Sequence, residues 1–127
     1  TIAQNAAMKA LELDNNHFKA IKASLLKRRA IVISALSDLE GFDSNFSEGA
    51  SYLFPSIKRF LGKRLNSNEV ILNDTNFCTQ LLSSEHVATV PGSSFGSKDS
   101  IRISYALSEK DLRTGCKRIK QFCERLI

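Results

Sequence analysis

The sequence predicts an α+β fold in which a small, mostly antiparallel sheet packs against helices, with a long helix near the N-terminus. Apolar residues recur at helical spacing over residues 17–40 and again over residues 108–126. Residues 100–106 instead alternate apolar and polar side chains, as a strand with one buried face does. With 127 residues, 43% of them hydrophobic, the chain is long enough to form one domain with its own core.

The first third of the chain is expected to be helical. Residues 1–13 form a short helix whose small and apolar side chains share one face, so we expect that face to pack against another helix or domain. Asp14 and the two asparagines after it can cap a second helix. That helix is expected over residues 17–40, with Gly41 as the residue that ends it.

Short strands and loops are expected to follow. Residues 42–46 and 51–54 are predicted to be two strands joined at a turn around Gly49, and Pro55 limits the second one. Residues 58–70 show no stable period, so we expect an irregular loop there.

The last half is expected to return to helix, strand, strand and helix. Asn73 or Asp74 can cap a helix that ends near Glu85, and residues 87–90 are predicted to be a strand. Residues 91–97 form a turn-rich loop, in which a glycine lets another backbone or a substrate approach closely.

The end of the chain carries the clearest strand and helix patterns. In the strand at residues 100–106, Ile101 and Ile103 share a face with Tyr105, and Arg102 points the other way. Ser108 caps the final helix, whose apolar stripe consists of Leu112, Cys116, Ile119, Cys123 and Leu126.

The charge balance raises nucleic-acid binding first. Lys and Arg number 18 against 13 Asp and Glu, a net charge of +5. The basic clusters at residues 27–29, 58–59, 63–64 and 117–120 could contact phosphates, but acids are interspersed and no exposed aromatic pair accompanies these bases. We therefore expect a solvated basic face and no nucleic-acid partner.

Metal and membrane sites are not expected. The three cysteines include no CxxC pair, and His17 lies far from His86, so we expect buried reduced thiols and no metal site. The longest uncharged apolar run, residues 30–37, is too short for a bilayer, so we expect no membrane partner and a cytoplasmic location. Because the chain starts at Thr1 and not at Met, we expect it to be part of something longer.

Arg102 is the strongest candidate site residue. A strand arginine is ordinarily an exposed edge residue or an ion-pair partner. Here the strand lies between a glycine-rich loop and a capped helix, so its polar face could instead line a cleft. A fixed guanidinium there could bind a carboxylate through two parallel hydrogen bonds. The residues alone leave these two interpretations open.

Three consecutive segments have a familiar pattern: VPGSSFG at residues 90–96, IRISYA at 101–106 and SEKDL at 108–112. In order and spacing they resemble the C-terminal part of class I aminotransferases, which are fold-type I pyridoxal-phosphate enzymes. Residues 1–11 and the run from Gly49 to Tyr52 are similar to two further segments of that family. The subgroup that the chain resembles most is the bacterial aspartate aminotransferases, some of which also accept prephenate.

The resemblance implies roles for a few residues. It aligns Arg102 with the arginine that binds the substrate α-carboxylate, and it makes Gly49, Ser51 and Tyr52 candidates to line the cleft. Ser51 stands where the family usually carries an aromatic residue. The Schiff-base lysine of the family lies upstream of the matching region, so Lys9 is not expected to take its place, and no catalytic residue is expected in this segment.

The resemblance also implies an overall organisation. Residues 1–13 would be a connecting helix from an absent large domain, and residues 14–127 the C-terminal small domain. The complete enzyme would use pyridoxal 5′-phosphate to transfer an amino group between aspartate and 2-oxoglutarate, and it would be a cytoplasmic homodimer. This segment alone would be inactive, and the uncovered face of residues 1–13 would favour self-association.

Two other functions remain open at this point. The chain could be a stand-alone α+β binding or regulatory module, or a basic nucleic-acid-binding domain. A large domain encoded directly upstream of Thr1 would favour the aminotransferase, whereas an initiation codon there would favour the module. Salt-dependent binding of an oligonucleotide would favour the third function.

Overall fold

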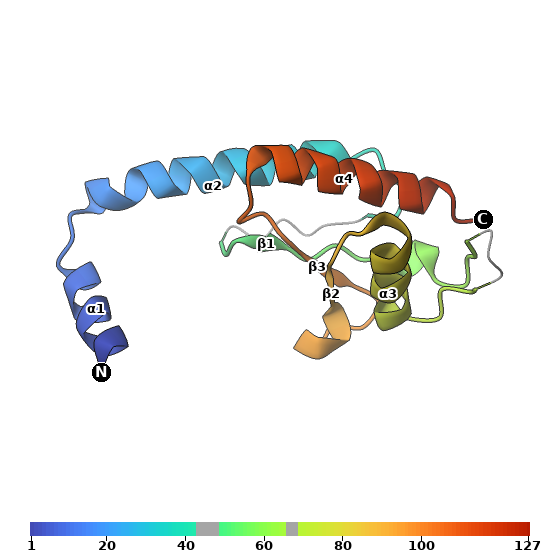
Figure 1. The fold of residues 1–127 in the computed structure, drawn as a ribbon, viewed down its shortest axis with the longest axis horizontal. Coiled ribbons are helices and arrows are strands. Elements are labelled where there is room, and N and C mark those ends of the chain that lie inside the picture. The colour runs from blue at the N-terminus through green and yellow to red at the C-terminus, as the bar shows by residue number, and fades with distance from the viewer. Residues whose placement is uncertain (43–48, 66–68) are drawn as a thin grey trace.

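The computed structural model describes residues 1–42, 49–65 and 69–127. Its first two helices are α1 (Ile2–Leu11) and α2 (Asn15–Leu36). Thr1 caps α1 with a capping box. The carboxylate of Asp14, one of the three caps that the sequence offers, caps α2. Figure 1 shows α2 extending along the top of the molecule with α1 hanging from its far end, away from the other elements.

Helix α2 ends one turn earlier than expected. The helical hydrogen bonds finish where the N–H of Ser37 donates to the carbonyl of Ile33, and tighter turns follow, so the predicted end near residue 40 is wrong. Gly41 does adopt a left-handed conformation, with φ of +96°, but in the turn that follows the helix. A Cβ at Gly41 would lie 2.6 Å from the Cβ of Arg59, so the approach of that side chain also requires glycine.

The sheet is small and antiparallel, with the order β1-β3-β2. Its strands are β1 (Tyr52–Leu53), β2 (Val90–Pro91) and β3 (Ile101–Ser104). The strand expected over residues 87–90 is shorter and shifted, because pairing with β3 begins only at Val90. The strand expected over residues 42–46 falls mostly outside the described residues, so the structure leaves it untested.

Two helices and two short 3₁₀ turns complete the described part of the fold. Helix α3 (Asp74–Glu85) is capped by Asn73, and α4 (Glu109–Glu124) is capped by Ser108. The 3₁₀ turn η1 (Lys58–Phe60) interrupts the expected irregular region, and η2 (Gly92–Phe95) lies in the turn-rich loop. The observed helices and antiparallel sheet confirm the predicted α+β class.

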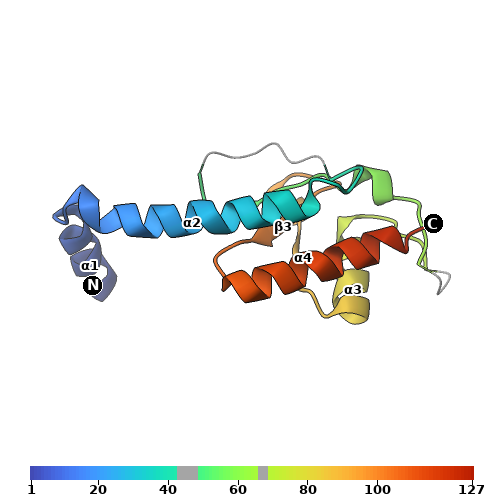
Figure 2. The same ribbon diagram turned by 90° about the horizontal axis from the view of Figure 1, so that it is seen from above.

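The core lies between α4, α3, the second half of α2 and one face of the sheet (Figure 2). Phe77 on α3 is fully buried at its centre, where its ring packs against those of Phe60 at 5.9 Å and Phe122 at 5.1 Å. All five apolar residues predicted for the stripe of the last helix are buried, although Leu126 lies just beyond the end of α4. Phe122 was missed by that prediction because it lies beside the stripe and not on it.

The apolar stripe of α2 is only half used by this core. Val32 and Leu36 are buried, as the pattern predicts, but Phe18 is 43% and Ile21 52% exposed. The first half of α2 carries its apolar face beyond the packed body, and α1 has no buried residue at all. The helical pattern was right, but it could not show where along the helix its partner elements end.

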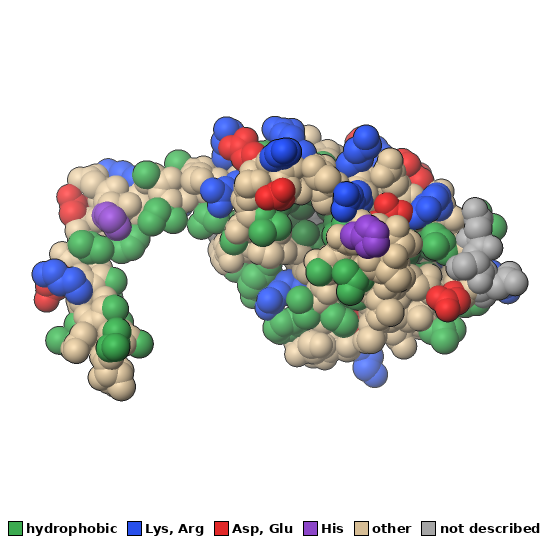
Figure 3. Space-filling model, viewed as in Figure 1, with side chains coloured by type: hydrophobic (Ala, Val, Ile, Leu, Met, Phe, Trp, Pro, Cys, Tyr) green, Lys and Arg blue, Asp and Glu red, His purple; other side chains and the backbone are tan. Residues whose placement is uncertain are grey.

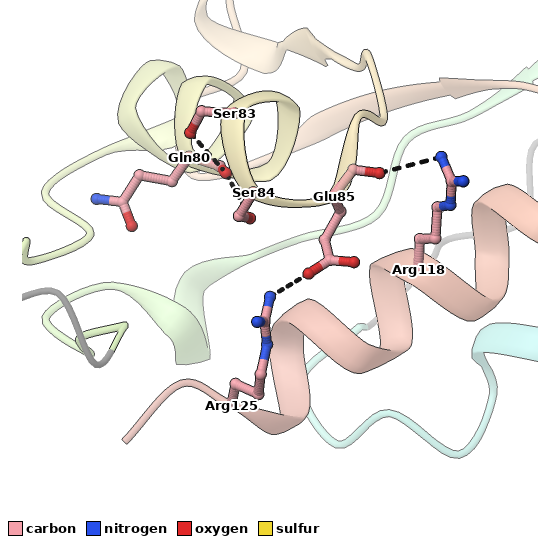
Figure 4. A network of polar contacts seen from close by, with 6 residues as sticks. All are labelled: Gln80, Ser83, Ser84, Glu85, Arg118 and Arg125. Carbon is pink, nitrogen blue, oxygen red and sulfur yellow. Dashed lines mark hydrogen bonds and ion pairs between the residues drawn. The ribbon is translucent and has the colours of Figure 1, made fainter.

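A polar network joins the end of α3 to α4 (Figure 4). The carboxylate of Glu85 pairs with the guanidinium of Arg125, and the backbone carbonyl of Glu85 accepts a hydrogen bond from Arg118 at 3.2 Å. Next along the chain, His86 ends α3 in a left-handed conformation with φ of 56°. The network fixes the direction in which the chain leaves α3 toward β2.

The surface carries bases and acids side by side along α2 and α4 (Figure 3). Lys27 pairs with Glu109 at 2.7 Å, and Lys120 with Asp38 at 3.6 Å. In the described part of the chain, no helix is long and apolar enough to cross a bilayer, and no cluster of three metal-ligating side chains occurs.

Candidate functional site

Arg102 lies in the middle of the central strand, with its side chain on the face away from the core. Its neighbours Ile101 and Ile103 point inward and are buried, so the alternation predicted from the sequence is confirmed. Arg102 itself is half-buried. Because β3 pairs on both sides, the backbone beneath this side chain is held by two neighbouring strands.

Two aromatic rings hold the guanidinium of Arg102. Its Cζ lies 4.5 Å from the ring centroid of Phe95 and 5.0 Å from that of Tyr52. Tyr52 is opposite Ser104 in the β1–β3 register, which places it on the same face as Arg102. The ring of Phe54 packs edge-on against Phe95 at 6.1 Å and extends the aromatic surface.

The guanidinium has no acidic partner among the described residues. None of their hydrogen bonds or ion pairs involves Arg102, whose guanidinium instead lies over the two aromatic rings. Ring faces fix the plane of a guanidinium without using its N–H donors. The edge of the Arg102 fork is therefore available for a planar, bidentate acceptor such as a carboxylate.

The loop that carries Phe95 folds tightly through Gly92. The N–H of Gly92 donates to the carbonyl of Ser100 at 2.8 Å, and its own carbonyl accepts from the N–H of Ser97 at 3.1 Å. A Cβ on Gly92 would lie 2.4 Å from the carbonyl oxygen of Ser97 and 2.6 Å from that of Ser100. This confirms the expected close approach of another backbone, and Gly96 closes the turn with φ of 78°.

A buried carboxylate anchors the same loop from α3. Asp74 is 4% exposed, and its two oxygens accept hydrogen bonds from the N–H of Ser93 at 2.6 Å and the N–H of Thr75 at 3.0 Å. Burial alone would raise the pKa of Asp74, but hydrogen bonds from Ser93 and Thr75 hold it below its ordinary value. The sequence suggested Asp74 only as a possible cap, because its contact to Ser93 spans nineteen residues.

The other predicted cleft residues do not all join Arg102. Tyr52 does, but Gly49 lies on the side of the sheet that faces α2, where it lines an apolar groove of about 310 Å³ with Phe18 and Leu25. The backbone carbonyl of Ser51 accepts a hydrogen bond from the N–H of Tyr105 at 2.9 Å. Neither Phe95 nor Phe54 was predicted to lie near Arg102. For Phe95, the available signal was its place beside Gly96 at the end of the glycine-rich loop.

The lysines of the described chain are spread over its surface. All are exposed except Lys120, which is half-buried and pairs with Asp38. None therefore has the buried, desolvated setting in which a lysine becomes a covalent anchor.

Comparison with known proteins identifies the family. Residues 1–119 match the family described as aminotransferase class I and II. The chain belongs to this family. It is 40% identical over 126 residues to the aspartate aminotransferase of Rhizobium meliloti and 42% identical over 123 residues to a probable aspartate/prephenate aminotransferase of Rhizobium leguminosarum. These matches cover 99% and 97% of this chain, respectively.

Solved aminotransferases share the fold. The crystal structure of the Rhizobium meliloti aspartate aminotransferase superposes with a TM-score of 0.90 at 40% identity over 99% of this chain and 32% of its own. An aspartate aminotransferase from Thermotoga maritima gives a TM-score of 0.75 at 34% identity, covering 98% of this chain and 28% of its own. The chain spans 31% of the length of both curated Rhizobium relatives named above.

Proposed function

We propose that the chain is the C-terminal small-domain part of an aspartate aminotransferase, in which Arg102 binds the α-carboxylate of the amino-acid or 2-oxo-acid substrate. The observation that supports this most directly is the guanidinium of Arg102, which two aromatic rings orient and no acid among the described residues neutralises. The names of the relatives support aspartate as the amino-acid substrate. The resemblance to class I aminotransferases implies 2-oxoglutarate as the acceptor.

The chemical task of Arg102 follows from its geometry. A bidentate contact fixes both the position and the plane of a carboxylate, and thereby the direction of the bonds at the neighbouring carbon. The rings of Tyr52 and Phe95 limit rotation of the fork before substrate arrives, which lowers the entropy lost on binding. A lysine at the same position would supply charge without the planar fork.

The complete enzyme would need groups from outside this chain. Pyridoxal phosphate, on which this family generally depends, stabilises the carbanion formed at the substrate Cα. The described residues do not fit a site for it, because no buried lysine is present to anchor it. We therefore assign the cofactor site to the large domain.

The same proposal divides the chain into two parts. Residues 1–13 connect to the large domain, and residues 14–127 are the small domain. The exposed apolar side chains of α1 support this division, because α1 has no buried residue in the described structure. The complete enzyme would be a cytoplasmic homodimer, whereas this segment alone would be inactive.

The test uses the complete reading frame that contains this chain. Transamination between aspartate and 2-oxoglutarate is measured for the wild type and for Arg102→Lys, with Arg113→Lys on the surface of α4 as the matched control. Loss of a charge-assisted bidentate contact should lower kcat/KM by about 10- to 100-fold, mainly through KM, whereas the control should be unchanged. Unchanged kinetics of Arg102→Lys with several amino acids, or a wild type without transaminase activity, would overturn the proposal.

A further inference from the structure

The two aromatic rings over the Arg102 guanidinium, those of Tyr52 and Phe95, are held in different ways. Tyr52 is fixed by the pairing of β1 with β3, the strand that carries Arg102 itself. Phe95 is the last residue of the 3₁₀ turn η2, outside the sheet, and its ring is 51% exposed. The position of this ring over the guanidinium therefore depends on what holds η2.

Asp74 is the side chain that ties η2 to α3. Its carboxylate accepts the N–H of Ser93, two residues before Phe95, at 2.6 Å. The other oxygen accepts the N–H of Thr75, which fixes the rotation of the carboxylate. Because Asp74 is buried, water competes little for these bonds, and a charged acceptor makes them strong.

We propose that Asp74 is a positioning residue for Arg102: it holds η2 so that the ring of Phe95 covers the guanidinium and orients it for a carboxylate. Asp74 does not itself touch Arg102 or substrate. The proposal rests on the proposed function for its enzymatic consequence, but the mechanical link from Asp74 through η2 to Arg102 stands on the contacts alone.

The link is tested first on this chain by NMR. Protons of the Arg102 guanidinium lie over two ring faces, so ring currents should shift their resonances upfield. Asp74→Asn keeps the size of the side chain but places an amide donor where one N–H is now accepted, so the Arg102 resonances should move downfield toward those of Phe95→Leu. Asp111→Asn is the matched control, because Asp111 also lies in the first turn of a helix and accepts a hydrogen bond from a serine, Ser108.

Two results decide this step. Unchanged Arg102 resonances in folded Asp74→Asn would overturn the proposal, and so would an equal shift in Asp111→Asn. If Asp74→Asn does not fold, Asp74→Ser makes the same test, because it removes the long acceptor without placing a donor against the Ser93 amide.

The consequence for substrate is tested in the complete reading frame. Loss of the Phe95 contact should raise KM for the amino acid by about 2- to 5-fold with little change in kcat. In an Arg102→Ala background, Asp74→Asn should cause no further rise in KM, because the group that Asp74 positions is gone. If Asp74→Asn acted only by lowering stability, its effect would instead persist in that background.

The two proposals fail in different ways. If Arg102→Ala raises KM and Asp74→Asn does not, the positioning role of Asp74 is wrong and the proposed function stands. If Arg102→Ala leaves KM unchanged, the proposed function is wrong, and the NMR shift alone then decides whether Asp74 positions Arg102.

Discussion

Gly92 should be the glycine whose replacement damages the site most directly. In Gly92→Ala the new Cβ would lie 2.4 Å from one backbone oxygen and 2.6 Å from another, and neither belongs to a flexible side chain that can move aside. The loop must shift as a unit, which carries Phe95 away from Arg102. Overpacking of this kind costs about 1–3 kcal/mol, which corresponds to a fall in Tm of roughly 4–12 °C for a domain of this size.

Gly115 on α4 provides a control, because the same substitution there should raise the free energy of unfolding and not lower it. Apart from the neighbouring backbone of its own helix, no atom lies within 4 Å of a Cβ built at this position, and its backbone is helical. Gly115→Ala should therefore raise the free energy of unfolding by roughly 0.5–1 kcal/mol. Urea unfolding of the two variants measures both effects, and Gly92→Ala should also move the Arg102 resonances. A Gly92→Ala variant as stable as the wild type would refute the reasoning from backbone contact.

The buried thiols, one ion pair and the exposed N-terminal helix each make a measurable prediction. Burial raises the pKa of the Cys123 thiol from 9.0 to about 12, so the folded state keeps a proton that the unfolded chain loses. The free energy of unfolding should then fall as pH rises from about 9 to about 12. Cys123→Ala should flatten the curve of urea midpoint against pH. Parallel curves for the wild type and Cys123→Ala would contradict this. Arg125→Ala should lower the free energy of unfolding by roughly 0.5–1 kcal/mol, because the side chain of its partner Glu85 is only 13% exposed. This loss should shrink in 1 M salt. Lys9→Ala breaks an ion pair in which both side chains are exposed, so it should cause almost no loss of stability. Leu11 is 88% exposed on α1, so Leu11→Lys should reduce self-association in sedimentation velocity, and a wild type that stays monomeric at high concentration would contradict this.

Local patterns predicted the elements near the site well. The alternation around Arg102 identified both its strand and its outward direction, because successive side chains of a strand point to opposite faces. The serine cap and apolar stripe placed α4 correctly, since capping and helical period depend on neighbours within one or two turns. The end of α2 was misplaced by a turn, because an apolar pattern continues into the tight turns that replace the helix.

The sequence by itself determined the α+β class, the outward-facing arginine and the glycine-rich loop beside it, because each depends on residue types at short spacing. Only the tertiary structure decided which side chains meet that arginine. Phe95 reaches it through a turn whose position depends on Asp74, and Gly49 lies on the other side of the sheet, facing α2. The physical reason is that a loop's path is fixed by hydrogen bonds between segments distant in sequence, and periodicity records only which face a residue occupies, not which distant residue covers it.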